Sequence, residues 1–144
     1  MREEKFRYLE EHTADVAFEA YGSDLNEAFV NAAKAMFNVM TDISKVNPKE
    51  KREIIVRDED LKGLLKKWLE ELLFLFDAEG IIFSEFNVTI KREDDEWVLQ
   101  GEAYGEPFDP EKHPSHLEVK AVSYHMMEIG ERNGEKFVRV ILDI

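Results

Sequence analysis

A polar turn near the N-terminus carries the first residues that could do chemistry. The run from Glu11 to Asp15 contains a histidine, a hydroxyl and two carboxylates, and an apolar strand pattern follows it directly. Such a turn can direct His12 and Asp15 outward at the edge of a sheet. The same residue types also satisfy loop amides in Asx and Thr turns, and that structural role is the commoner one.

The C-terminal end is the second candidate. The run from Phe137 to Ile144 is apolar up to the last residue, apart from Arg139 and Asp143. A strand fixed in this way holds its own α-carboxylate one residue from the Asp143 side chain. Two carboxylates so close repel each other unless a cation lies between them, and Ca²⁺ and Mg²⁺ prefer oxygen ligands. Asp15 would add a third donor, whereas the simpler alternative makes Asp143 a solvated strand end.

The segment from Leu117 to His125 is the third candidate. If this segment is a strand, one face carries Glu118, Lys120, Val122 and Tyr124. Lys120 could then pair with Glu118 or with the acidic cluster. His125 would lie on the opposite face, where a single histidine is more often packed or hydrogen-bonded than a metal ligand.

Composition and charge narrow the function classes. The 144 residues include 19 basic and 32 acidic ones, so the net charge is −13. This charge repels phosphate backbones, so direct nucleic-acid binding is not expected. No apolar run reaches the roughly 20 residues of a membrane span, and the N-terminus does not resemble a signal peptide. Without cysteine, disulfides, thiolate metal sites and cysteine nucleophiles are excluded. We expect a cytoplasmic protein with a thermophile-like, Glu- and Lys-rich composition.

No short motif of a known enzyme class is present. The glycines are scattered and form no phosphate-binding loop, and no serine has the flanking glycines of a nucleophile elbow. His113 and His116 lie in or beside a proline-containing loop and lack a zinc-type spacing.

Two amphipathic helices are the clearest elements. Asp24 followed by Glu27 resembles a capping box at the start of the first helix. Its apolar stripe consists of Leu25, Phe29, Ala32, Ala33, Met36, Phe37 and Met40. The apolar face of the second helix consists of Leu61, Leu64, Leu65, Trp68, Leu69, Leu72, Leu73 and Phe76. Gly80 provides a stop signal.

Strand patterns surround these helices. They cover residues 6–9, 16–21, 52–57, 86–90, 97–104, 117–130 and 137–144, with a hairpin turn at Asn133-Gly134. The order lacks regular βαβ alternation and so favours an α+β fold. We expect a single domain over residues 1–144 with two layers, in which the two helices pack on one face of a mixed, mainly antiparallel sheet.

Taken together, these segments resemble the archease family over essentially the whole chain. The most specific part is the run from Glu11 to Val16, followed by a strand and the helix that begins at Leu25. The second helix, the segment with Glu118 to Ala121 and Tyr124-His125, and the terminal Asp143-Ile144 are similar to the family as well. Each segment alone is weak evidence, but four in the family's order make a specific match.

The resemblance implies an activator of the GTP-dependent tRNA-splicing ligase that has no turnover of its own. Such a protein promotes guanylylation of a ligase histidine, allows multiple turnover and broadens the nucleotides accepted. The family binds a divalent metal, reported as Ca²⁺, near an acidic tip. Matched by residue, the ligands would be Asp15, Asp143 and the terminal carboxylate of Ile144, with His12, Lys120 and His125 as supporting residues. Mg²⁺ is the alternative ion.

Two other functions remain open at this point. In a small metal-dependent hydrolase, Asp15 and Asp143 would hold Mg²⁺ and His12 or His125 would act as general base. A chaperone-like binding module is the third interpretation. The sequence leaves the native ion, the ligase-contacting surface and the oligomeric state open.

Overall fold

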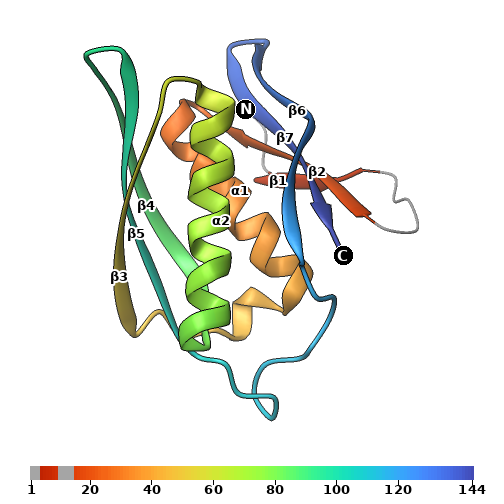
Figure 1. Cartoon of the computed structure of the whole chain (residues 1–144). Coiled ribbons are helices and arrows are strands. Elements are labelled where there is room, and N and C mark those ends of the chain that lie inside the picture. The colour runs from red at the N-terminus through yellow and green to blue at the C-terminus, as the bar shows by residue number, and fades with distance from the viewer. Residues whose placement is uncertain (1–3, 10–14) are drawn as a thin grey trace.

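The computed structural model describes residues 4–9 and 15–144 and places two helices between two sheets (Figure 1). One sheet has the strand order β1-β2-β7-β6 and the other the order β3-β5-β4. The strands are β1 (Phe6–Tyr8), β2 (Asp15–Gly22), β3 (Glu50–Asp58), β4 (Ile81–Glu93), β5 (Glu96–Pro107), β6 (Ala121–Arg132) and β7 (Glu135–Asp143). The helices are α1 (Leu25–Met40), the short 3₁₀ helix η1 (Ile43–Lys45) and α2 (Leu61–Glu79).

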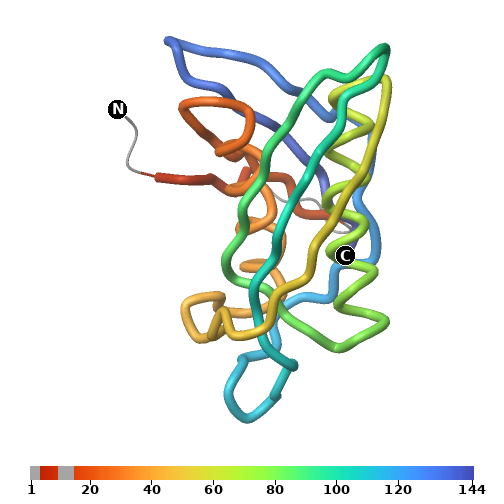
Figure 2. Tube along the Cα trace, turned by 90° about the vertical axis from the view of Figure 1, so that its left-hand side faces the viewer, coloured from red at the N-terminus to blue at the C-terminus, as the bar shows by residue number. Residues whose placement is uncertain are grey.

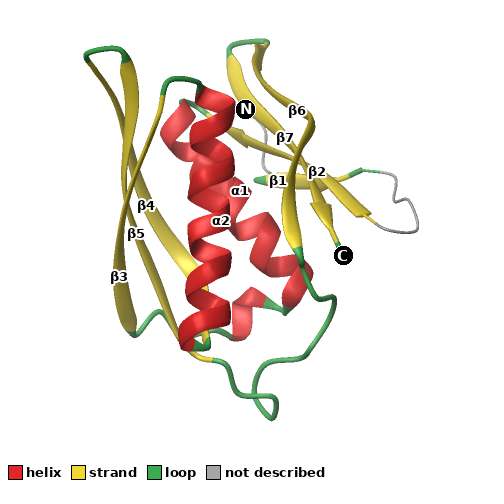
Figure 3. Ribbon diagram, viewed as in Figure 1, coloured by secondary structure: helices red, strands yellow, loops and turns green. Residues whose placement is uncertain are grey.

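The arrangement of layers corrects one prediction. The α+β class is confirmed, but the helices do not cover one face of a single mixed sheet. Each helix contacts strands of both sheets, and every strand pair in the described residues is antiparallel (Figure 3). The reason lies in α1, where Ala28, Ala35 and Val39 are buried outside the predicted apolar stripe. A helix that is apolar on most sides needs neighbours on most sides.

The predicted start of α1 is confirmed with one change. Asp24 is the N-cap, and its Oδ1 accepts a hydrogen bond from the Glu27 amide at 2.8 Å. The Glu27 side chain reaches back to the amide of Ser23 at 2.6 Å rather than to that of Asp24. Both bonds satisfy amides that would otherwise lack partners at the helix start.

Trp68 of α2 joins the layers. Its side chain is fully buried, and its Nε1 donates to the carbonyl of Phe29 in α1 at 3.1 Å. On the other side it lies against β5 at Gly101, where an added Cβ would stand 2.6 Å from the indole Cζ3. Only glycine allows this close approach of the indole to the sheet. Gly80, with φ 71°, caps α2 in the left-handed conformation that the sequence predicts.

The β4–β5 and β6–β7 hairpins extend beyond the ends of the two helices (Figure 1). Figure 2 shows β3, β5 and β4 from their outer side, with α2 behind β3. The β6–β7 turn uses Asn133 and Gly134 at φ 52° and 78°, which confirms the predicted hairpin. No helix in the described part of the chain is long and apolar enough to cross a lipid bilayer.

Candidate metal centre at the end of the four-stranded sheet

The four-stranded sheet brings two of the predicted site residues together. Asp15 at the start of β2 lies directly opposite Asp143 at the end of β7, so their side chains share one face of the sheet. The third strand also reaches this point, since Ala121 of β6 lies opposite Asp143. The Lys120 amide donates to the carbonyl oxygen of Asp143 at 2.8 Å. Segments from three parts of the sequence thus fix the backbone of Asp143.

The Asp15 carboxylate lacks a partner for one of its oxygens. Its Oδ1 is buried and has no hydrogen-bond donor among the described residues. A buried carboxylate oxygen without a donor is unfavourable, and a second carboxylate directly opposite adds repulsion. A cation placed between the two side chains would remove both penalties.

Ile144 is the third residue of the predicted ligand set. It follows directly after β7, and its side chain is partly buried and packs against the hydrophobic core. Its backbone is therefore next to Asp143 in the chain. We call the Asp15 and Asp143 carboxylates and the α-carboxylate of Ile144 the acidic tip. Its all-oxygen donor set fits Ca²⁺ or Mg²⁺, which take oxygen ligands, and does not resemble a zinc site.

The remaining predicted residues lie differently. Within residues 4–9 and 15–144, no group of three or more His, Cys, Asp or Glu side chains is arranged to hold a metal ion. Lys120 is exposed and contacts the tip through its backbone amide. His125 is exposed, and its amide donates to the Ser123 hydroxyl at 3.0 Å. His12 lies outside the described residues.

The predicted strand over 117–130 is wrong in two respects. Residues 117–120 precede the strand, which begins at Ala121, and Lys120 is exposed whereas Val122 is buried. The pairing of β6 with β7 also shifts between Ser123 and Glu128. This bulge includes Met126 at φ 56°. The face shared by Glu118, Lys120, Val122 and Tyr124 therefore does not exist, and a bulge of this kind re-aims side chains.

The bulge creates a contact that the sequence does not reveal. The Tyr124 hydroxyl donates a short hydrogen bond to Asp60, the N-cap of α2. This bond holds the pKa of Asp60 below its usual value, and the Asp60 carboxylate raises the pKa of Tyr124. No sequence signal marks this bulge, because methionine has no preference for the left-handed region.

A groove beside the tip is the second missed feature. It has a volume of about 580 Å³, and its walls include Met40, Phe76, Phe108 and Leu117. Lys120 lines its end, so the groove adjoins the acidic tip. Leu117 is 44% exposed there. The sequence carries no signal for this irregular segment, because the exposure of Leu117 follows from the fold and not from its residue type.

A buried ion cluster anchors the loop that leads to this groove. One Glu106 oxygen accepts bonds from the Asn47 amide at 2.8 Å, Lys112 Nζ at 2.7 Å and His113 Nε2 at 2.9 Å. Burial acts to raise the pKa of Glu106, but these three donors outweigh it and lower the pKa to about 2. His113 is fully buried and accepts the Asp109 amide at Nδ1, so it serves the loop and not a metal.

Fold and site together define a class of protein: a small α+β protein with two helices between two antiparallel sheets, in which Asp15 and Asp143 face each other at the end of one sheet. The sequence matches the Archease protein family (MTH1598/TM1083) over residues 6–144. It is 47% identical over 141 residues to the protein archease of Sulfurisphaera tokodaii, covering 98% of this chain and 99% of that protein. The archease of Methanothermobacter thermautotrophicus is 52% identical over 132 residues, which are 92% of this chain and 94% of that one. The chain belongs to the archease family.

Solved structures agree with this assignment. The solution structure of protein 1598 from Methanobacterium thermoautotrophicum is 49% identical and superimposes with a TM-score of 0.86 over 97% of this chain and 99% of that chain. A Thermotoga maritima crystal structure, named "an archease, possible chaperone", shares the fold at a TM-score of 0.59 with 20% identity, covering 96% and 97%. The family assignment does not favour the metal-dependent hydrolase.

Proposed function

We propose that this protein activates the GTP-dependent tRNA-splicing ligase in the cytoplasm and has no turnover of its own. The proposal rests on membership of the archease family together with one observation at the acidic tip. That observation is the placement of Asp15 opposite Asp143, with a buried Asp15 carboxylate oxygen that has no hydrogen-bond donor among the described residues. Such a site carries negative charge that would bind a cation. It is accessible from the surface because Asp143 is exposed.

In this proposal the acidic tip holds a divalent cation, most readily Ca²⁺ and alternatively Mg²⁺. When bound, the ion supplies positive charge that neutralises the clustered carboxylates and orients groups of the partner. The chain's own residues do the rest. The β2–β7 pairing fixes the spacing of Asp15 and Asp143, the Lys120 amide holds the Asp143 backbone, and the packed Ile144 side chain holds the terminal carboxylate.

The net charge of this protein favours association with the proposed partner. The net charge of −13 complements the positive active site expected of an enzyme that binds GTP and RNA. The same charge argues against a direct role in holding RNA. We therefore expect the protein to dock on the ligase and promote guanylylation, multiple turnover and use of further nucleotides.

The test is a guanylylation assay with purified ligase, GTP and either Ca²⁺ or Mg²⁺. We expect the wild-type protein to stimulate the ligase and to show no ligase or nucleotide hydrolysis activity alone. Asp15→Ala and Asp143→Ala should lose stimulation. Asp95→Ala, which removes an exposed carboxylate in the β4–β5 turn, is the matched control and should retain it.

Two outcomes would contradict this function. Hydrolysis of nucleotides or esters by the protein alone, lost in Asp15→Ala, would support the hydrolase. Protection of the ligase against aggregation without any change in guanylylation would support the chaperone-like module.

A further inference from the structure

The outer edge of β3 lies open between two contacts with α2. Among the described strands only β5 pairs with β3. At one end Lys67 Nζ lies 3.2 Å from Asp58 Oδ2, and at the other Arg52 Nη2 lies 2.9 Å from Glu79 Oε1. The helix thus runs alongside the strand, and the segment from Glu53 to Val56 lies between these two ion pairs.

The backbone of this segment presents hydrogen-bonding groups to the open edge. In an antiparallel strand, alternate residues direct both backbone groups to the same side. The Arg57 carbonyl accepts Lys67 Nζ at 2.6 Å, and the Lys51 carbonyl accepts Arg52 Nη1 at 3.0 Å, so both carbonyls face away from β5. Glu53 and Ile55 alternate in phase with them and direct their N–H and C=O groups to the same open side.

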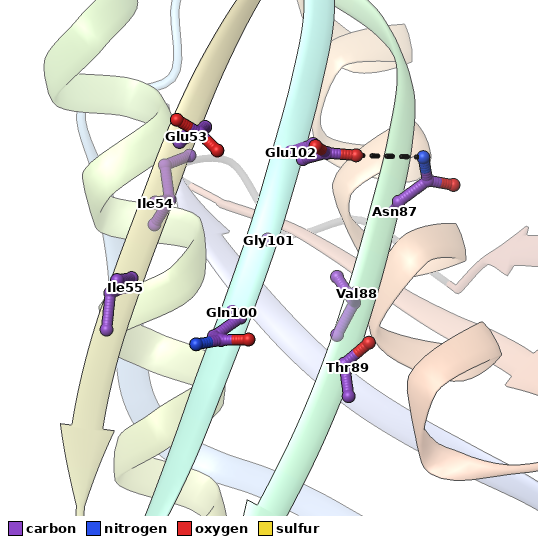
Figure 4. A pocket seen from close by; sticks show the side chains of 9 residues that line it. All are labelled: Glu53, Ile54, Ile55, Asn87, Val88, Thr89, Gln100, Gly101 and Glu102. Atoms are coloured by element: carbon purple, nitrogen blue, oxygen red, sulfur yellow. Dashed lines mark hydrogen bonds between the residues drawn. The ribbon is translucent and has the colours of Figure 1, made fainter.

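Exposed apolar side chains flank this edge on both faces. Ile55 is 64% exposed on the outer face of the sheet, at the margin of a shallow pocket of about 340 Å³ shared with β5 and β4 (Figure 4). Phe74 is 59% exposed on α2. It follows Lys67 by two helical turns on the same side of the helix, so it lies beside the same stretch of edge. An open edge with exposed apolar residues is a template for an added strand.

When two copies of β3 lie antiparallel, acidic residues of one copy lie opposite basic residues of the other. We propose that β3 pairs in antiparallel fashion with β3 of a second copy of this chain, about a two-fold axis at Ile55. Ile55 then faces its own counterpart, and Glu53 faces the second copy's Arg57. On the other face Arg52 meets Asp58 and Ile54 meets Val56. Every charged pair within this stretch unites opposite signs, which stabilises cross-strand neighbours.

Glu53 and Arg57 are available for the new pairs, whereas Arg52 and Asp58 already pair with Glu79 and Lys67 of α2 and would share these partners. Glu53 is exposed and forms no ion pair within the described residues. Arg57 has one acidic neighbour, Glu93, at 3.8 Å, and both side chains are 51% exposed. Pairing would join the two three-stranded sheets into one continuous sheet and cover Ile55 and Phe74 of both copies. The net charge of −13 on each copy opposes association, so we expect a weak dimer.

A charge-swap series tests the pairing by sedimentation at physiological salt. We expect the wild-type chain to dimerise with concentration, and Arg57→Glu to weaken dimerisation about tenfold because each dimer contains the pair twice. The double variant Glu53→Arg with Arg57→Glu restores opposite signs and should recover the wild-type constant. Lys91→Glu carries the same charge change on β4 and is the control.

The absence of cysteine gives a second test that does not depend on affinity. Ile55→Cys should form a disulfide-linked dimer on mild oxidation, because the two residues 55 face each other across the axis. Thr89→Cys, exposed on β4 in the same sheet face, should remain mostly monomeric. A monomer at all concentrations, a double variant no better than Arg57→Glu, or equal cross-linking of the two cysteine variants would overturn the proposal.

Discussion

Strand β2 carries two carboxylates, Glu19 and Asp15, and the residues opposite them on β7 differ in the sign of their charge. Along β2 and β7, Glu19 lies opposite Arg139, whereas Asp15, nearer the end, lies opposite Asp143. Glu19 is buried and accepts bonds from both terminal nitrogens of Arg132, at 3.3 and 2.9 Å. These bonds hold the pKa of Glu19 below its usual value despite its burial. Glu19 thus has its positive partners within the chain, whereas the described residues supply none to Asp15.

Under the proposed function, this difference separates carboxylates that stabilise the fold from carboxylates that bind a cation. Glu19 and Glu106 each have donors in the chain that offset their burial, so their contribution is to stability. Asp15 has a buried oxygen with no donor among the described residues, and a like charge lies opposite it. We expect such a site to contribute little to the stability of the metal-free fold and to become favourable when a cation binds.

A cationic side chain within the acidic tip should change metal binding most. Asp143→Arg places a guanidinium opposite Asp15, as Arg139 lies opposite Glu19. We expect Ca²⁺ affinity to fall by about a hundredfold or more, since one ligand is lost and a positive charge is added. Activation of the ligase should be lost with it. Thermal unfolding in metal-free buffer should show equal or greater stability, by roughly 0.2–1 kcal/mol. A destabilised variant would mean that Asp143 has a structural role.

The converse change breaks the internal pair. Glu19→Gln removes the charge that Arg132 binds, and we expect a loss of about 1–3 kcal/mol in the free energy of unfolding. Urea denaturation measures this loss. Ca²⁺ affinity should stay within about twofold of wild type, because Glu19 lies further along β2 and is separated from Asp15 by three residues. A large fall in Ca²⁺ affinity would show that the two sites are not separate.

The lowered pKa of Glu106 makes the stability of the fold depend on pH in the acid range. Its pKa is about 2 in the folded chain and near 4.5 when unperturbed. A depressed folded pKa stabilises the fold above the unfolded value, and this stabilisation is lost as the pH falls from 4.5 towards 2. We expect Glu106→Gln to reduce stability at neutral pH and to flatten the pH dependence in that window. An acid limb that stays unchanged in Glu106→Gln would contradict this role of Glu106.

The smallest expected effect concerns the chain end. Residues added after Ile144 replace its carboxylate by a neutral carbonyl, which still coordinates Ca²⁺ but carries no charge. We expect Ca²⁺ binding and ligase activation to weaken by about three- to tenfold. An equal tag before Met1 should have no effect. Equal activation by both tagged proteins would remove Ile144 from the ligand set.

Much of the fold could be predicted because local signals coincide with the tertiary arrangement. Asp24 and Gly80 mark helix ends, and Asn133-Gly134 marks a hairpin, for reasons that act within a few residues. The division into two sheets could not be predicted from the stripe of α1. Its alanines pack on any close neighbour, so they do not reveal how many neighbours there are.

The approach of Asp15 to Asp143 was predictable because it depends on strand ends. Asp143-Ile144 closes an apolar run, and the register that brings Asp15 opposite Asp143 follows once β2 pairs with β7. The bulge at Met126 and the irregular segment 117–120 were not predictable, because contacts with α1 and α2 decide them. The Leu117 amide donates to the Val39 carbonyl at 3.1 Å, and Tyr124 binds Asp60.

The most direct test of the acidic tip is Ca²⁺ titration calorimetry on the wild-type protein, Asp15→Asn and Asp143→Asn. Both substitutions keep the side-chain shape and remove one charge. We expect saturable binding by the wild type, at least about tenfold weaker binding by each variant, and equal melting temperatures in metal-free buffer. Unchanged Ca²⁺ affinity in both variants, or no binding by the wild type, would contradict a metal site formed by Asp15, Asp143 and the Ile144 carboxylate.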